Sequence, residues 1–158
     1  LCGILPRRIN IPTSDKLPAD SRTMPKNIIT DEKLRDEVLA AYAVYLKAFL
    51  SNDMDTLNSM MIYPLAHIGN GRVRMYDTFP FNPAEMMAAK QMVSTIDTDY
   101  EVVSLTSKKA HLILHTGTRV RKDGTPIETV AAFYALTRTD TGWKFFALSD
   151  ISVPAVQK

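Results

Sequence analysis

The fold is decided by residues 100–151, which read YEVVSLTSKKAHLILHTGTRVRKDGTPIETVAAFYALTRTDTGWKFFALSDI. β-branched and aromatic residues fill this stretch, and two segments rich in turn residues interrupt it, at 122–124 and 140–142. The pattern predicts strands over residues 100–105, 110–121, 127–138 and 143–151. Because tight turns join the three long strands, we expect them to form an antiparallel meander.

Helices are expected before these strands. The first should follow Thr30 or Asp31, whose side chains can cap a helix. Its apolar residues recur at steps of four, four, three and four: Leu34, Val38, Tyr42, Tyr45 and Phe49. Ser51-Asn52 ends this helix and Asp53 starts a short second one. Both helices therefore precede the predicted strands in the chain.

The segment between the second helix and residue 100 predicts a hairpin and a third helix. Residues 64–68 and 72–76 read as two strands around the turn Gly69-Asn70-Gly71. Residues 82–85 read Asn-Pro-Ala-Glu, a helix start in which Asn caps and Pro occupies the first position, and this helix should run to about Val93. We predict one α+β domain over residues 30–158, with a curved sheet around a small apolar pocket.

Residues 1–29 differ from the rest of the chain. Proline recurs there at nearly even spacing, at positions 6, 12, 18 and 25, and proline blocks both helix interiors and central strands. We expect an extended arm that lies along its own domain or along a partner subunit.

Composition excludes several classes of protein. The length of 158 residues suits one domain, and the net charge is +2. The single cysteine, Cys2, leaves no partner for an internal disulfide. The sequence contains no run of 18 apolar residues, so we expect no membrane-spanning helix. Basic and aromatic residues do not alternate on one face, so we expect no nucleic-acid partner. The expected location is the cytoplasm.

The order helix, helix, hairpin, helix and four strands resembles the nuclear transport factor 2 superfamily, over about residues 30–151. Three stretches carry the resemblance: residues 45–57, YLKAFLSNDMDTL; residues 64–71, PLAHIGNG; and residues 140–146, DTGWKFF. The resemblance implies a cone-shaped α+β barrel with a pocket between the sheet and the helices. Members include isomerases, polyketide cyclases of the SnoaL type, epoxide hydrolases, dehydratases and binding domains, so fold alone does not choose a function.

Within this superfamily, the steroid isomerase branch implies three catalytic positions. A Tyr stands eight residues before the Asp that opens the second helix, as Tyr45 stands before Asp53. The branch also has an acidic hydrogen-bond donor eight residues before the turn glycine, where this chain has Tyr134, a donor but not an acid. The general base of the branch is an Asp in the first hairpin strand, but here the titratable residue nearby is His67. We therefore expect His67 as base, with Tyr45 and Tyr134 as donors to an oxyanion.

The pocket is expected to hold further side chains and no cofactor. The predicted lining residues are Tyr42, Phe49, Met60, Met61, Tyr63, His115 and Trp143. A metal site is not expected: His111 and His115 share one face of a strand, but the strand rise separates them by roughly 13 Å. Asp77 and Asp150 are the remaining candidate acids. Arg119 and Arg121 could clamp a carboxylate, but their place near the 122–124 turn favours a solvated hairpin end.

The last strand is apolar on both faces, which bears on assembly. Strict alternation puts Trp143, Phe145 and Ala147 on one face and Phe146, Leu148 and Asp150 on the other. An outward apolar face needs a cover, so we predict a homodimer through the sheet.

The sequence is compatible with two functions. One is a cofactor-independent isomerase, dehydratase, cyclase or hydrolase acting on a small apolar molecule with a carbonyl or epoxide. The other is a non-catalytic domain that binds a hydrophobic ligand or a protein. The first requires His67, Tyr45 and Tyr134 to meet at one cavity.

Overall fold

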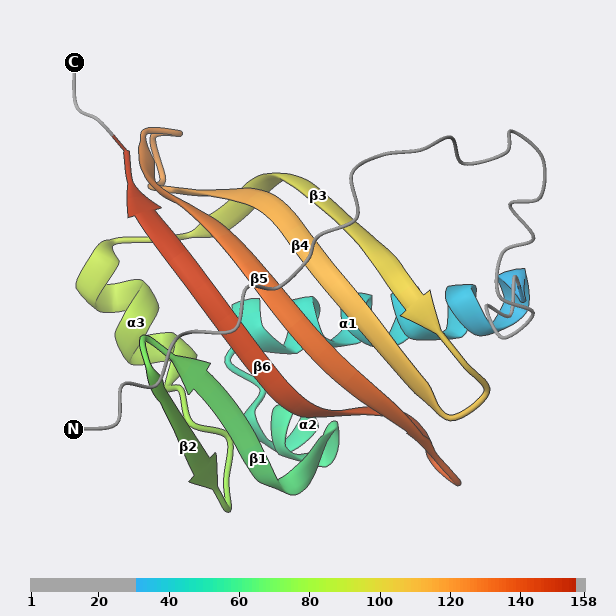
Figure 1. Ribbon diagram of the computed structural model, residues 1–158. Coiled ribbons are helices and arrows are strands. Elements are labelled where there is room, and N and C mark those ends of the chain that lie inside the picture. The colour runs from blue at the N-terminus through green and yellow to red at the C-terminus, as the bar shows by residue number, and fades with distance from the viewer. Residues whose placement is uncertain (1–30, 156–158) are drawn as a thin grey trace, which may run out of the picture.

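A computed structural model describes residues 31–155 of the chain (Figure 1). The expected arm over residues 1–29 lies outside the described residues. Within them the chain is α+β, with three helices and one six-stranded sheet. The described part has no helix that is both long and apolar enough to cross a membrane.

The sheet has the strand order β2-β1-β6-β5-β4-β3. Its strands are β1 (Met61–Gly69), β2 (Arg72–Tyr76), β3 (Ser94–Leu105), β4 (Lys109–Val120), β5 (Pro126–Thr139) and β6 (Gly142–Pro154). The β3–β6 meander is antiparallel as predicted, whereas β1 pairs with β6 in parallel. Since β2 and β3 are edge strands that do not pair with each other, the sheet is open, and the expected cone does not close into a barrel.

Helix α1 (Glu32–Leu50) crosses one face of this sheet (Figure 1). The Asp31 side chain caps it by accepting a hydrogen bond from the Leu34 amide, 3.2 Å away. The predicted apolar stripe packs on the sheet: Leu34, Val38, Tyr42 and Tyr45 are buried and Phe49 is partly buried. Val44, on the opposite side of the helix, is 49% exposed, so burial is confined to one face.

Helices α2 (Met54–Ser59) and α3 (Pro83–Lys90) begin at the predicted caps, Asp53 and Asn82. Helix α3 ends at Lys90, earlier than the expected Val93, because Gln91 adopts the left-handed conformation with φ 54°. The following segment joins the sheet instead, and Ser94 pairs with Val120. Strand β3 is therefore six residues longer at its start than the apolar pattern predicted.

Strand β1 also begins earlier than predicted, at Met61 rather than Pro64. Its pairing with β6 is irregular between Met61 and Ala66, and β2 pairs with it only from Leu65 onward. Pro64 therefore occupies a place where the regular ladder requires no amide donor, and it does not end the strand.

The face of the sheet that points away from α1 carries exposed apolar side chains on β1, β2 and β6. Ile151 and Val153 alternate along β6 with residues of the opposite face and are 65% and 60% exposed. Ile68 on β1 is paired with Val73 on β2, which is 64% exposed. These side chains form a surface that no described residue covers.

Candidate functional site

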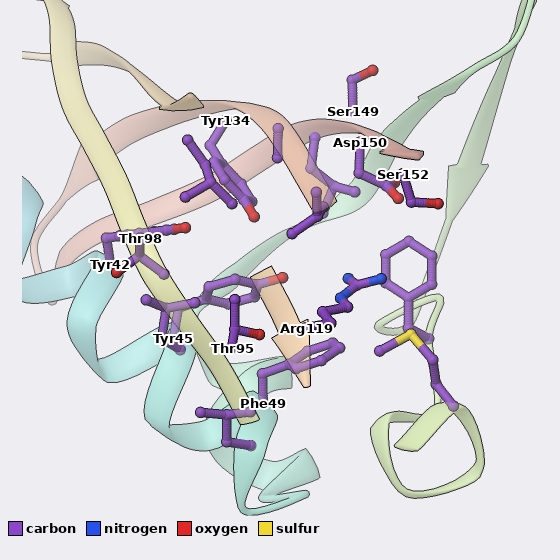
Figure 2. Close-up of a pocket in the computed structure, with 18 of the residues that line it drawn as sticks. Tyr42, Tyr45, Phe49, Thr95, Thr98, Arg119, Tyr134, Ser149, Asp150 and Ser152 are labelled. Carbon is purple, nitrogen blue, oxygen red and sulfur yellow. The ribbon is translucent and has the colours of Figure 1, made fainter. Parts of the chain in front are cut away.

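A cavity of about 210 Å³ lies between α1 and the inner face of β4, β5 and β6 (Figure 2). Its lining includes Tyr42, Tyr45, Phe49, Phe81, Lys90, Thr95, Thr98, Leu114, Arg119, Val130, Ala132, Tyr134, Leu148, Asp150 and Ser152. Apolar cavities of about 150 Å³ hold a benzene molecule. This space therefore suits a ligand with about one ring and a few further atoms.

Three tyrosines form one end of the cavity. Tyr42 and Tyr45 come from successive turns of α1, and Tyr134 comes from β5. The ring centroid of Tyr134 lies 5.2 Å from that of Tyr42 and 5.6 Å from that of Tyr45. All three are less than 8% exposed, because the helix stripe and the inner face of β5 pack directly on each other.

Burial keeps these tyrosines protonated. It raises the pKa of Tyr42 to about 12, and it raises the pKa of Tyr45 and Tyr134 well above the ordinary value of 10. The hydroxyl of Tyr42 is buried without a hydrogen-bond partner among residues 31–155. At neutral pH the cluster therefore presents neutral O–H groups, which can donate to a ligand oxygen.

The opposite part of the cavity is charged. Arg119 on β4 and Lys90 at the end of α3 both line it, and both donate hydrogen bonds to Oε1 of Glu128. Burial alone would raise the pKa of the Glu128 carboxyl, but the bonds from Lys90 and Arg119 bring that pKa below its usual value. Glu128 is 7% exposed and is therefore an ionised, nearly buried carboxylate.

Asp150 on β6 is the cavity's own carboxylate. Its Oδ1 lies 3.1 Å from Nε2 of His67 on the neighbouring strand β1. The Asp150 charge adds to the rise in the pKa of Tyr45 that burial mainly causes, and Arg119 opposes that rise. Asp150, Arg119 and Tyr45 thus act on one another across the same space, into which Figure 2 shows their side chains directed.

Comparison with known proteins identifies the family to which this architecture belongs. Residues 36–150 match the family model described as NTF2-like protein (DUF6841). The chain belongs to this NTF2-like family. The match confirms the resemblance to the nuclear transport factor 2 superfamily and includes all or most of each strand and helix.

Solved structures share the NTF2-like fold at low identity. An NTF2-like family protein from Streptomyces avermitilis is 21% identical, with a TM-score of 0.59 over 80% of this chain and 100% of that chain. An NTF2-like protein from Cytophaga hutchinsonii is 17% identical, with a TM-score of 0.56 over 75% of this chain and 97% of that chain. No curated protein matches the sequence. These likenesses show the fold alone.

The NTF2-like chain brings together only part of the expected site. Tyr45, Tyr134, Tyr42 and Phe49 all line the cavity. His67 is not among the lining residues, although its side chain is only 20% exposed and its ring packs 5.2 Å from that of Phe81, which does line the cavity. The imidazole therefore reaches the cavity through Asp150 rather than directly.

The other expected lining residues lie elsewhere in this NTF2-like fold. Met61 is a core residue, and the Tyr63 hydroxyl donates to Oδ1 of Asn58 at 2.6 Å. Met60 and Trp143 border a separate, open depression beside α1. His115 is exposed, and its Nε2 lies 2.9 Å from Glu101 Oε1. A polar side chain thus pairs with each of His67, Tyr63 and His115. The spacing of residues along the strands does not reveal these partners.

An irregularity in β6 turns Asp150 toward the cavity. The β5–β6 register shifts because Ala135 pairs with Ala147 while Leu136 pairs with Phe145. The extra residue is Phe146, and it moves Leu148 and Asp150 to the same face as Phe145. The strict alternation predicted from the sequence is therefore wrong after Phe146. Periodicity alone contains no signal for this shift.

Residues with metal-binding side chains are dispersed. His111 Nδ1 lies 2.8 Å from the Ser104 hydroxyl, and His115 pairs with a glutamate of β3. Within residues 31–155, no three His, Cys, Asp or Glu side chains are grouped closely enough to hold an ion.

Proposed function

We propose that the protein is a cofactor-independent enzyme that moves a proton next to the carbonyl of a small, largely apolar molecule. The observation that carries the proposal is the cavity itself, because buried neutral tyrosine hydroxyls and an ionisable carboxylate line the same space. The first group can hold developing negative charge on oxygen, and the second can accept a proton.

Each polar residue at the cavity has its own role in this reaction. Tyr45 and Tyr134 donate hydrogen bonds to the carbonyl oxygen of the ligand. The Asp150 carboxylate removes a proton from the adjacent carbon, whose electron pair passes into the enolate and leaves the charge on that oxygen. His67 holds Asp150 in place. Asp150 therefore takes the role that the sequence suggested for His67.

The enolate can then react in two ways within the expected range of chemistry. Return of the proton from Asp150 to a different carbon completes an isomerisation. Alternatively, the hydroxyl group on the next carbon takes the proton from Asp150 and leaves as water, while the electron pair of the enolate forms the new double bond, which completes a dehydration. The Streptomyces protein of the same fold is described as a proposed dehydratase, which is consistent with the second outcome but does not select it.

Hydrogen–deuterium exchange tests the first step without knowledge of the natural substrate. Phenylacetone or cyclohexanone is incubated with the protein in D2O, and loss of the signals from protons next to the carbonyl is followed by NMR. We expect Asp150→Asn and Tyr134→Phe each to slow the catalysed exchange about 100-fold, because each removes a base or a donor. Tyr76→Phe is the matched control, since Tyr76 lies on edge strand β2 outside the cavity lining.

A non-catalytic binding domain is the second candidate. It is favoured by the absence of His67 from the cavity lining, because the expected base does not face a ligand. In that case the ketones would bind, as measured by chemical-shift changes, while their protons exchange no faster than in buffer. Faster exchange that Asp150→Asn leaves unchanged would refute the assignment of the base.

A further inference from the structure

Arg119 and Lys90 present their charges to the cavity, and Glu128, the carboxylate to which both are bonded, lies behind them. Arg119 and Lys90 both line the cavity, whereas Glu128, which they share, does not. The Arg119 side chain is 12% exposed, so its guanidinium is largely withdrawn from solvent. Figure 2 shows it reaching into the middle of the lined space.

The arrangement leaves hydrogen-bonding capacity on Arg119. Its Nη1 donates to Glu128, and no other side-chain hydrogen bond joins the guanidinium to residues 31–155. Nη2 and Nε therefore remain available as donors. Asp150, the other carboxylate at the cavity, pairs with His67 and makes no ion pair with Arg119 within the described chain.

The charge balance favours one further negative charge. Two cations face one carboxylate in the cluster of Arg119, Lys90 and Glu128, which leaves an excess of one positive charge within the cluster; the Arg119 side chain is 12% exposed and that of Lys90 33%. The lining carboxylate, Asp150, pairs with His67 instead. A guanidinium pairs with a carboxylate through two parallel N–H bonds, and that geometry suits its free edge. A dianionic phosphate would bring twice the charge needed, next to the Asp150 carboxylate.

We propose that Arg119, supported by Lys90, is a carboxylate-binding subsite, so that the ligand is a small carboxylic acid with an apolar part of about one ring. This inference rests on the proposed function, since it names the substrate class of the same cavity. The carboxylate binds at Arg119 and the ring lies among Phe49, Phe81 and the tyrosines. The expectation that Arg119 lies at a solvated hairpin end is wrong, because its side chain points inward from β4 and is nearly buried.

The test compares phenylacetate with phenylacetamide, which have the same shape and differ in charge. Binding to the full chain is measured by chemical-shift titration at low salt. We expect the carboxylate to bind about 10- to 100-fold more tightly than the amide, the range for a hydrogen bond to a charged group. Arg119→Gln should bring this ratio close to one, because the carboxylate loses its charged partner. Arg121→Gln, two residues along the chain and outside the lining, should keep it.

A second variant separates ligand binding from a purely structural ion pair. Glu128→Gln removes the internal counterion, so the affinity for phenylacetate should rise and that for phenylacetamide should not. Equal binding of both probes by the unaltered protein, or an unchanged ratio in Arg119→Gln, would overturn the carboxylate subsite while leaving the apolar cavity intact. Failure of both probes to bind would overturn the subsite together with the proposed function.

Discussion

Replacing Glu128 with Gln measures how much the charge cluster contributes to folding. The carboxylate is 7% exposed and accepts hydrogen bonds from Lys90 and Arg119 through one oxygen. A hydrogen bond to a charged group contributes about 1.5–3 kcal/mol, and one between neutral partners about 0.5–1.5 kcal/mol. Glutamine keeps an acceptor oxygen but not the charge. Each bond therefore weakens by about 1 kcal/mol.

The Lys90 side chain is one-third exposed, so water screens part of its contribution. We expect Glu128→Gln to lower the free energy of unfolding by about 1–2 kcal/mol at pH 7. Urea unfolding can be followed through Trp143, the only tryptophan of the chain, which is 6% exposed in the folded state. Glu101→Gln is the matched control, because its pair with His115 is exposed and should change stability by less than about 0.5 kcal/mol.

The pH dependence of this difference has a definite sign. The folded-state pKa of Glu128 lies below its unfolded value. Its ionised form therefore stabilises the fold fully above the unfolded pKa, about 4.3, and loses that contribution as the pH falls through the lower folded pKa. The wild type should exceed Glu128→Gln by the same amount from pH 7 to about 5, and the difference should shrink below about pH 4. A difference that is absent at pH 7, or constant down to pH 3, would refute this account of the cluster.

Two further predictions concern packing and assembly. A Cβ atom at Gly117 would lie 2.9 Å from Cγ2 of Thr95. We therefore expect Gly117→Ala to lower the free energy of unfolding by about 1–3 kcal/mol, as measured by urea unfolding. Gly124→Ala is the comparison, because Gly124 has open space around it but φ 82°, so its effect reports backbone strain without crowding. We propose that the uncovered apolar face of the sheet pairs with a second copy of the chain, which predicts twice the monomer mass by light scattering. Ile151→Asp should give a monomer, whereas Val44→Asp on α1 should not; a monomeric wild type would refute the pairing.

Much of the fold follows from local sequence. The caps Asp31, Asp53 and Asn82 begin the three helices where their side chains predict. The helical stripe of α1 and the turns at Gly124 and Gly142 place the long elements, because capping, burial periodicity and turn conformation each depend on a few neighbouring residues. Tyr45 and Tyr134 could likewise be proposed for the site from spacing and resemblance.

The polar part of the site depends on tertiary structure. The extra residue at Phe146 turns Asp150 toward the cavity, and the pairing of β1 with β6 brings His67 to it from 83 positions away along the chain. Arg119 and Glu128 stand opposite each other on β4 and β5, so their side chains lie on the same face of the sheet. Lys90 of α3 is bonded to the same Glu128 oxygen. Local sequence determined the helices, the turns and the apolar inner face, because those depend on short-range conformation and burial. The strand registers decided which charged groups meet, since a shift of one residue reverses the face to which every later side chain points.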